Sequence, residues 1–384
     1  VHAGGETPPG GCFGGLADDY AELLRTAYLA ARSADPTAKV LFGGVAYDRF
    51  YNKSGYSPSG PFDYDFVGDT LDHLYGQHGG EAAWPFFDAM AVHVYNDYRD
   101  NWDGTPPYEQ ELVGKIGEFR EAQLVHAGWY DLRTRPLALT EAGLPSMPAN
   151  DGWTLRSESL QSAYPGQLLS RVMAVGASQA IWFSIEDHRT GNCANPYDWL
   201  GLGLLRSLTV YQAAQSCNPN PIPEYQVASP HERKPSHTAF GAAVGQLAGS
   251  SYDRQLTVTE TGSSLVQAYR FVRPGGARLI VAFTDNGDRL GKIGSTPAAV
   301  SMTFDASILP GWTGTLAVTR FDDARGYVPG FAQDPAVPEA TPASVDADAS
   351  VVVPSLGGAV YSTRVTGPGR SRPHPLDGSA APRR

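Results

Sequence analysis

Cysteine, basic residues and long apolar runs are scarce in this sequence, and each scarcity excludes a class of protein. Three cysteines among 384 residues rule out a disulfide-rich miniprotein and a four-cysteine zinc site. The 29 Lys and Arg residues against 40 Asp and Glu leave a net charge of −11. With no basic cluster, this charge argues against nucleic acid or an anionic membrane as a partner. No stretch approaches the roughly 18 consecutive apolar residues of a membrane span.

Motifs for metal and nucleotide chemistry are also missing. The sequence has no His-Glu-x-x-His, and its nine histidines are scattered. There is no P-loop lysine motif, and the glycines at 201–203 lack the third glycine of a dinucleotide fingerprint. No Gly-x-Ser-x-Gly elbow occurs. Residues 285–288 fit a hairpin turn better than a calcium loop. We therefore expect neither a metal nor a cofactor.

The cysteines leave two alternatives for the compartment. Cys193 and Cys217 lie in one loop-like stretch, where a disulfide between them would indicate an oxidising environment. The alternative is three inert thiols, with Cys12 as the third. The 43 glycines and 30 prolines indicate many turns and long loops, and the length predicts two domains.

Residues 17–248 alternate between helix-like and strand-like patterns. The apolar runs are short and nearly continuous, as expected for parallel strands covered on both faces, and they favour a barrel or a doubly wound sheet. Apolar positions from 20 to 31 recur with helical spacing, and Asp35-Pro36 should end that helix. The expected strands are 40–43, 87–95, 137–141 and 180–184, and the other helices are 66–75, 109–126, 160–175 and 236–247.

After about residue 250 the pattern changes to short strands separated by turn clusters. Seven such strands without a convincing helix predict a β-sandwich. The last residues, 367–384, are rich in Pro, Gly, Ser and Arg and should be disordered. The expected strands are 256–260, 265–272, 278–284, 299–304, 314–321, 350–353 and 359–365.

Candidate site residues follow from what stands at the carboxyl ends of the strands, where α/β barrels carry their chemistry. Glu141 closes the apolar strand 137–140 and is followed by small residues that leave room for a ligand. The alternative for Glu141 is a structural role, either capping the next helix or pairing with an arginine. His93 and Tyr95 end an earlier strand and share one side of it, because side chains alternate along a strand. A histidine satisfied in the core is the alternative for His93.

The last strand of this region ends in an aromatic residue and two carboxylates. Trp182 offers either a wall for a ligand or a core side chain, and Glu186 and Asp187 follow it. Aromatic faces such as Trp182, Trp84 or Trp102 are suited to stacking on the C–H face of a sugar.

Four strings carry a family resemblance: "DDYAELLRTAYLAARSADPTAKVLFGG", "FDAMAVHVY", "PLALTEAGLPS" and "AIWFSIEDH". They resemble the second half of a retaining TIM-barrel glycoside hydrolase, in the clan of cellulases, β-xylosidases and α-L-iduronidase-like enzymes. The resemblance covers about residues 1–248. It implies an O-glycosidase with a carbohydrate substrate, whose nucleophile is the Glu that ends the seventh strand. That position matches Glu141.

The resemblance also implies an acid/base residue at the end of the fourth strand, in an Asn-Glu pair. The carboxylate at the matching place is Glu6, but Gly5 replaces the asparagine, which normally hydrogen-bonds the sugar 2-hydroxyl. His93 and Tyr95 match positions that contact the nucleophile or the sugar, and Trp182 matches the platform on the eighth strand. We add Glu186 as a substrate-binding candidate.

The resulting expectation is a partial (β/α)8 barrel, with about strands four to eight, over residues 1–249. A β-sandwich follows over 250–366 and a tail over 367–384. We expect a retaining glycosidase that works with two Glu carboxylates and is extracellular, its signal peptide lost with a missing N-terminal part. The alternatives are a half-barrel completed by association and a non-catalytic glycan-binding or structural fragment. The sugar, the linkage and the oligomeric state do not follow from the sequence.

Overall fold

A computed structural model gives the structure of part of the chain. The expectations for Gly5, Glu6, the three cysteines, the 285–288 turn and the 367–384 tail lie outside the described residues. The described residues are 16–46, 65–95, 111–144, 158–187, 201–206, 231, 233–262, 266–284, 300–303, 308, 316–320, 350–353 and 359–363.

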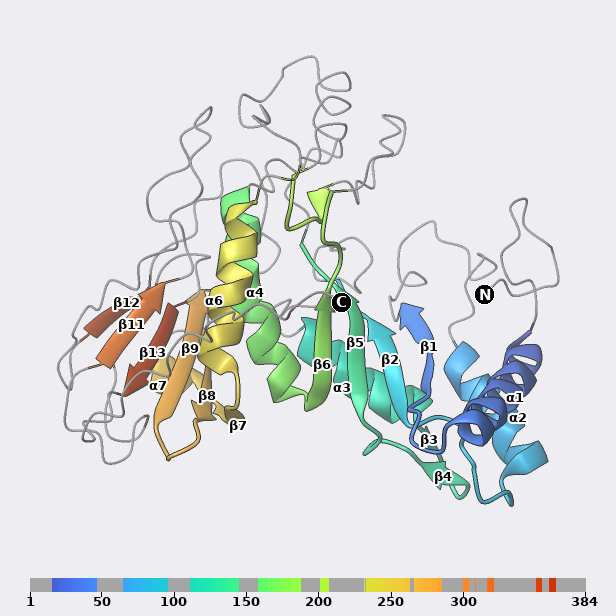
Figure 1. Ribbon diagram of the computed structural model, residues 1–384. Helices are drawn as coiled ribbons and strands as arrows, with labels where there is room; N and C mark the ends of the chain where they lie inside the picture. Colours follow the sequence, from blue (N-terminus) through green and yellow to red (C-terminus); the bar gives the residue numbers. More distant parts are fainter. Residues whose placement is uncertain are drawn as a thin grey trace, which may run out of the picture.

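A four-stranded parallel sheet forms the first part of the fold (Figure 1), in the order β1-β2-β5-β6. All four arrowheads point to the same edge, so the carboxyl ends of the strands lie together. This confirms the expected parallel strands. The strands are β1 (Leu41–Ala46), β2 (Ala89–His93), β5 (Leu137–Ala142) and β6 (Ala177–Trp182).

Burial explains why the two central strands are nearly continuous apolar runs. Met90 and Val92 of β2 and Leu137 and Leu139 of β5 are fully buried, because helices and neighbouring strands cover them. A helix precedes β1, and one follows each strand of the sheet among the described residues, which is the βα alternation predicted from the sequence. These helices are α1 (Ala17–Ala34), α2 (Phe66–His78), α3 (Glu111–Gln123), α4 (Glu158–Ala174) and α6 (Pro235–Leu247).

The end of α1 confirms the expected effect of proline. Asp35 has an extended backbone, with φ −143° and ψ 105°, and its N–H still donates to the carbonyl of Ala31. Pro36 excludes the helical conformation at the preceding residue, so the helix stops there.

The helix expected over 109–126 is shorter than predicted. α3 ends at Gln123, and the chain then forms a small hairpin of β3 (Val125–His126) and β4 (Tyr130–Asp131). Gly128, with φ 85°, supplies the left-handed residue that a three-residue hairpin loop needs.

A five-stranded antiparallel sheet forms the second part of the fold, in the order β11-β13-β9-β8-β7. A separate pair, β10 and β12, is also antiparallel. The strands are β7 (Ser251–Gln255), β8 (Val266–Val272), β9 (Arg278–Thr284), β10 (Val300–Thr303), β11 (Leu316–Arg320), β12 (Ser350–Val353) and β13 (Ala359–Thr363). A β-sandwich closed by these strands stays a prediction.

The prediction of a strand over residues 256–260 is wrong. That stretch holds a one-turn helix, α7 (Val258–Thr261), and β7 lies just before it. Thr257 and Glu260 form a capping box, and Gly262 ends the turn with φ 73°. The Arg254 guanidinium and the Thr257 hydrogen bonds lower the pKa of Glu260 to about 2, against desolvation that raises it.

Two helices join the parallel sheet to the antiparallel one. α4 and α6 lie between them in Figure 1. The buried Arg171 of α4 donates to the side-chain oxygen of Gln267 on β8 at 3.1 Å, and its guanidinium lies 5.0 Å from the ring centre of Phe283. Ala243 and Leu247 of α6 pack into the same cluster as the apolar residues of β8 and β9. The described helices include none long and apolar enough to cross a membrane.

Candidate active site

Glu141 stands at the carboxyl end of β5, the next-to-last residue of the strand. Its side chain is 31% exposed, although the strand before it is buried. The Tyr95 hydroxyl donates to Glu141 Oε2 at 2.8 Å, and His93 Nδ1 lies 3.3 Å from the same oxygen. Among the described residues no hydrogen bond or ion pair engages Oε1. One carboxylate oxygen is therefore held, and the described residues make no polar contact with the other.

The backbone of β2 brings His93 and Tyr95 to this carboxylate. His93 is the register partner of Glu141 in the parallel ladder, and the N–H of Val94 donates to the carbonyl of Glu141 at 3.1 Å. Residues two apart face the same side of a strand, so His93 and Tyr95 both reach across to β5. The sequence therefore predicted three side chains that the structure brings together.

Gly44 of β1 makes room for this arrangement and was not predicted. A Cβ atom at Gly44 would stand 2.2 Å from His93 Nε2, closer than any real contact, so only glycine allows the imidazole to lie there. The preceding Gly43 receives Tyr20 in a similar way, because its N–H donates to the Tyr20 hydroxyl at 2.7 Å. Paired glycines inside a strand are the signal that could have indicated a close approach.

Trp182 and Glu186 lie elsewhere on the same edge of the sheet. Trp182 is 6% exposed, and its ring packs edge-on against Tyr164 and Phe240, while its indole N–H donates to the carbonyl of Leu202 at 2.9 Å. This is the packing of a core residue, and stacking of Trp182 on a sugar stays a prediction. Glu186 Oε2 lies 3.2 Å from His231 Nδ1.

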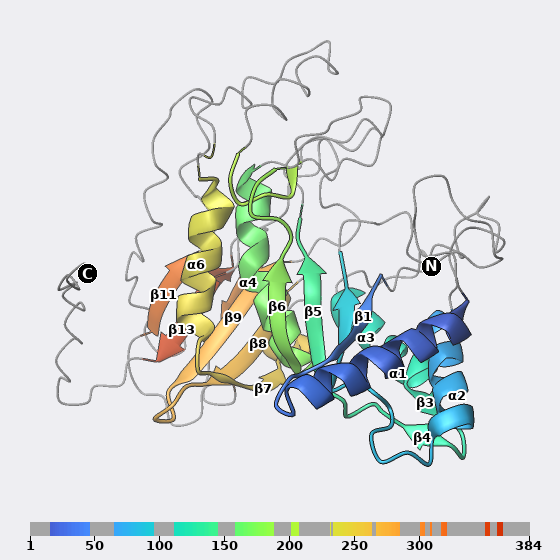
Figure 2. The ribbon, with the colours of Figure 1, turned by 45° about the vertical axis from the view of Figure 1, so that its right-hand side comes forward.

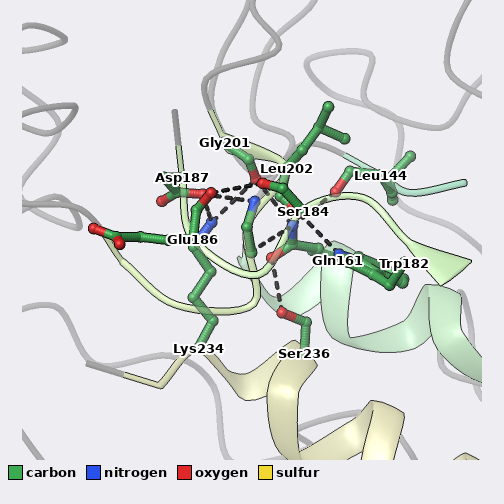
Figure 3. A network of polar contacts seen from close by, with 11 residues as sticks. Leu144, Gln161, Trp182, Ser184, Glu186, Asp187, Gly201, Leu202, Lys234 and Ser236 are labelled. Atoms are coloured by element: carbon green, nitrogen blue, oxygen red, sulfur yellow. Dashed lines mark hydrogen bonds and ion pairs between the residues drawn. The ribbon is translucent and has the colours of Figure 1, made fainter. Parts of the chain in front are cut away.

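A buried ion pair fixes the loop that follows β6 (Figure 3). Lys234 Nζ donates to Asp187 Oδ1 at 2.5 Å, and both side chains are fully buried. The same oxygen of Asp187 accepts the backbone N–H of Gly203 at 2.8 Å. Asp187, one of the two carboxylates at this strand end, is therefore engaged in structure, whereas Glu186 points away from the network in Figure 3.

Gln161 of α4 extends this network to the end of β5. Its amide nitrogen donates to the carbonyls of Leu144 and Gly201 at 2.7 and 2.9 Å, and its oxygen accepts the Ser236 hydroxyl at 2.9 Å. Leu144 lies three residues after Glu141, so the buried network ties the loops after β5 and β6 to one another. Sequence reasoning missed it, because its members are spread over four segments.

The site that the structure assembles is a carboxylate, an imidazole and a phenol at the carboxyl edge of a parallel sheet. Such an arrangement can present a nucleophilic or basic oxygen that is oriented by a hydrogen-bond donor. Within the described ranges, no group of three His, Cys, Asp or Glu side chains is placed to hold a metal ion.

Comparison with known proteins gives similarity at the level of structure. No sequence-family model matches the chain, and no curated protein matches it. A family 51 α-L-arabinofuranosidase from Bifidobacterium longum has a TM-score of 0.51 and 11% identity, over 93% of this chain and 65% of that one. An α-L-arabinofuranosidase from Thermotoga maritima, in complex with arabinose, has a TM-score of 0.49 and 11% identity, over 91% of this chain and 63% of the other.

These similar structures are glycoside hydrolases, and this chain spans slightly less than two thirds of their length. At such low identity the similarity concerns the fold. The resemblance noted in the sequence therefore holds at that level: the chain shares the fold of TIM-barrel glycoside hydrolases.

Proposed function

We propose that this protein is a retaining glycoside hydrolase that cleaves O-glycosidic bonds of an oligo- or polysaccharide, with Glu141 as the nucleophile. The observation that carries the proposal is the state of Glu141. A carboxylate at the end of a buried strand is partly exposed, and one of its oxygens is held by Tyr95 and lies beside His93. The position agrees with the carboxyl-edge location of active sites in α/β barrels.

In the proposed first step, Glu141 Oε1 attacks the anomeric carbon while the bond from that carbon to the leaving oxygen breaks. An acid, which we assign to Glu6, donates its proton to the leaving oxygen. In the second step the same residue takes a proton from water, the water oxygen attacks the anomeric carbon, and the ester to Glu141 breaks. Two inversions retain the configuration, and they require the two carboxyl groups to lie about 5 Å apart.

A second candidate function is glycan binding without hydrolysis. The observation that favours it is Gly5, which stands where the related enzymes carry the asparagine that contacts the sugar 2-hydroxyl. Under this alternative, replacing Glu6 by Gln would leave sugar binding unchanged, and no hydrolysis would be measured in either protein.

Covalent labelling tests the proposal directly. A 2-fluoro glycoside with a good leaving group slows the second step more than the first, so the glycosyl ester should accumulate on Glu141. The structural similarity to a family 51 α-L-arabinofuranosidase makes α-L-arabinofuranosides the first choice of probe, with xylosides and glucosides as further probes. The label is located by mass spectrometry of the digested protein, and Glu141→Gln serves as the unlabelled control.

Each outcome of the labelling decides between the candidates. A label on Glu141 with release of the leaving group supports the retaining mechanism. A label on another carboxylate removes Glu141 from the proposed role. Binding of the probes without any label or hydrolysis supports the glycan-binding alternative.

Replacing Tyr95 by Phe should lower kcat of the intact enzyme about 10- to 100-fold. The loss is one hydrogen bond to a charged group, at about 1.5–3 kcal/mol, and it is felt in the second step, in which the Glu141 carboxylate regains its charge as the ester breaks. KM should change little, because Tyr95 contacts Glu141 and is not assigned a contact with substrate. Tyr252→Phe, on β7 in the antiparallel sheet, is the matched control. Equal kinetics in both variants would show that Tyr95 does not orient the carboxylate.

We also propose how the described parts belong together. Within the described residues β1 and β6 each pair with one strand only, and a sheet edge of this kind is normally covered or paired. Our proposal is that further strands complete these edges into a barrel. The catalytic region would then end near residue 249, and a β-sandwich would span residues 250–366. We also propose that the protein acts outside the cell.

A further inference from the structure

The β3–β4 hairpin lies at the end of the parallel sheet opposite to Glu141. Figures 1 and 2 both draw β4 beyond the starting ends of the parallel strands, away from their arrowheads. The hairpin links α3 to the start of β5, whereas Glu141 is near the end of that strand. The hairpin is therefore spatially separate from the candidate active site.

An exposed tryptophan is the main feature of the hairpin. Trp129 is 47% exposed, although two rings stack on it: His126 at 4.2 Å between ring centres and 27° between planes, and Tyr75 at 5.4 Å and 21°. Tyr75 in turn meets Trp84 edge-on at 5.4 Å. Nearly half of the Trp129 surface thus faces solvent, while two aromatic rings support the indole. We call Asp72, Tyr75, His126 and Trp129 the Trp129 platform.

Polar contacts fix the β3–β4 hairpin to α2 and so hold the Trp129 platform together. The buried Tyr130 donates its hydroxyl to Asp72 Oδ1 at 2.7 Å, and His126 Nε2 lies 3.6 Å from Asp72 Oδ2. Burial, followed by the hydrogen bond to Asp72, raises the pKa of the Tyr130 hydroxyl above its ordinary value. The hydroxyl therefore stays protonated and keeps donating. A preorganised aromatic face of this kind costs little conformational entropy when a ligand binds.

The rim of the platform carries charge. The Asp72 side chain is partly exposed, and at the end of the hairpin Asp131 pairs with Arg133 at 2.7 Å. Arg133 also contacts Glu121 at 3.0 Å, and these three side chains are well exposed. The core of a protein–protein interface is depleted of charged residues, so this surface is a poor fit to an apolar protein partner.

We propose that the Trp129 platform is a second carbohydrate-binding site, which holds a sugar ring of a polysaccharide away from the reacting bond. A sugar ring has an apolar C–H face and a rim of hydroxyl groups. The exposed part of the Trp129 indole matches the first, and the partly exposed carboxylate of Asp72 matches the second. The choice of a carbohydrate ligand rests on the proposed function.

Such a site affects long and short substrates differently. It raises the affinity for a long chain, because a polymer can engage both sites at once, and it does nothing for a small glycoside that reaches only the catalytic site. The Trp129 platform should therefore affect polysaccharide binding and leave the hydrolysis of an aryl glycoside unchanged.

The test compares Trp129→Ala with the unaltered protein in native gels that contain soluble arabinoxylan, arabinan or β-glucan. We expect retardation by at least one polysaccharide, and an apparent Kd about tenfold weaker in Trp129→Ala, as for the loss of one strong aromatic contact. Hydrolysis of an aryl glycoside should stay unchanged. Leu23→Ala, which removes an exposed apolar side chain from α1, is the matched control and should alter neither. Trp129→Tyr keeps a ring and should retain part of the binding, which guards against a folding defect.

The proposal is overturned if none of the three polysaccharides retards the unaltered protein, or if Trp129→Ala is retarded as strongly as the control. It is also overturned if the substitution changes the oligomeric state but not polysaccharide binding, since the surface would then be a protein interface. The proposed function fails separately: labelling and activity at Glu141 report on the catalytic site, and gel retardation reports on Trp129.

Discussion

Replacing Glu141 by Gln should lower kcat for glycoside hydrolysis by roughly 10⁴- to 10⁶-fold, the range seen when a covalent nucleophile is removed. The amide has nearly the volume of the carboxylate and keeps an oxygen that accepts the Tyr95 hydroxyl, so the local structure should survive. It has no charged oxygen to attack the anomeric carbon, and no glycosyl ester forms. The measurement is kcat with an activated aryl glycoside, together with a thermal unfolding curve that checks the fold.

A smaller side chain turns this loss into a positive test. Glu141→Gly leaves a space in which azide can attack the anomeric carbon, and the product should be the glycosyl azide of inverted configuration. Glu121→Gln, on the exposed surface of α3, is the control carboxylate and should keep full activity. Activity of Glu141→Gln above a hundredth of the unaltered enzyme, or an azide product of retained configuration, would contradict the assignment of Glu141.

The cluster around Glu141 could be predicted because it depends on local rules. Strand ends were readable from short apolar runs, parallel strands place those ends at one edge, and alternation places His93 and Tyr95 on one side. Each step uses only neighbours in sequence. The register that pairs His93 with Glu141 then follows from the sheet itself.

Elements that depend on turn and cap chemistry were misjudged. The helix expected to reach residue 126 stops at Gln123, because the chain turns into a hairpin closed by Gly128. The expected strand at 256–260 contains β-favouring residues, but the capping box of Thr257 and Glu260 stabilises a helical turn there. In both places a short-range hydrogen-bonding pattern prevailed over the pattern of apolar residues.

Partners far apart in the chain could not be paired from the sequence. Asp187 looked like a carboxylate available at a strand end, and nothing nearby marks Lys234, 47 positions later, as its partner. Only the packing of α6 against α4 and the loop after β6 brings them together. The same holds for Arg171 and Gln267, which lie 96 positions apart.

Replacing Lys234 by Met should destabilise the protein by about 3–5 kcal/mol, the usual cost of leaving one charge of a buried pair without its partner. The Lys234 ammonium is fully buried and also donates to the carbonyl of Gly201 at 3.0 Å, so a second acceptor loses its donor. The free energy of unfolding is measured by urea denaturation followed by tryptophan fluorescence. Arg233→Met removes the same charge from the exposed neighbouring residue and should cost less than about 0.5 kcal/mol.

A double variant separates two contributions to the free energy of unfolding: the cost of an unpaired buried charge and the stabilisation that the whole network provides. Lys234→Met with Asp187→Leu removes both charges, and buried pairs replaced in this way often lose little stability. Here the recovery should be partial, because Asp187 Oδ1 also accepts the N–H of Gly203, and a leucine leaves that buried donor unpaired. The double variant should therefore be more stable than Lys234→Met and less stable than the unaltered protein.

If Lys234→Met is no less stable than Arg233→Met, the pair does not hold the loop after β6. That loop connects to Leu144 through Gln161, so its loosening should also reduce activity at Glu141, with kcat falling in parallel with stability across the series.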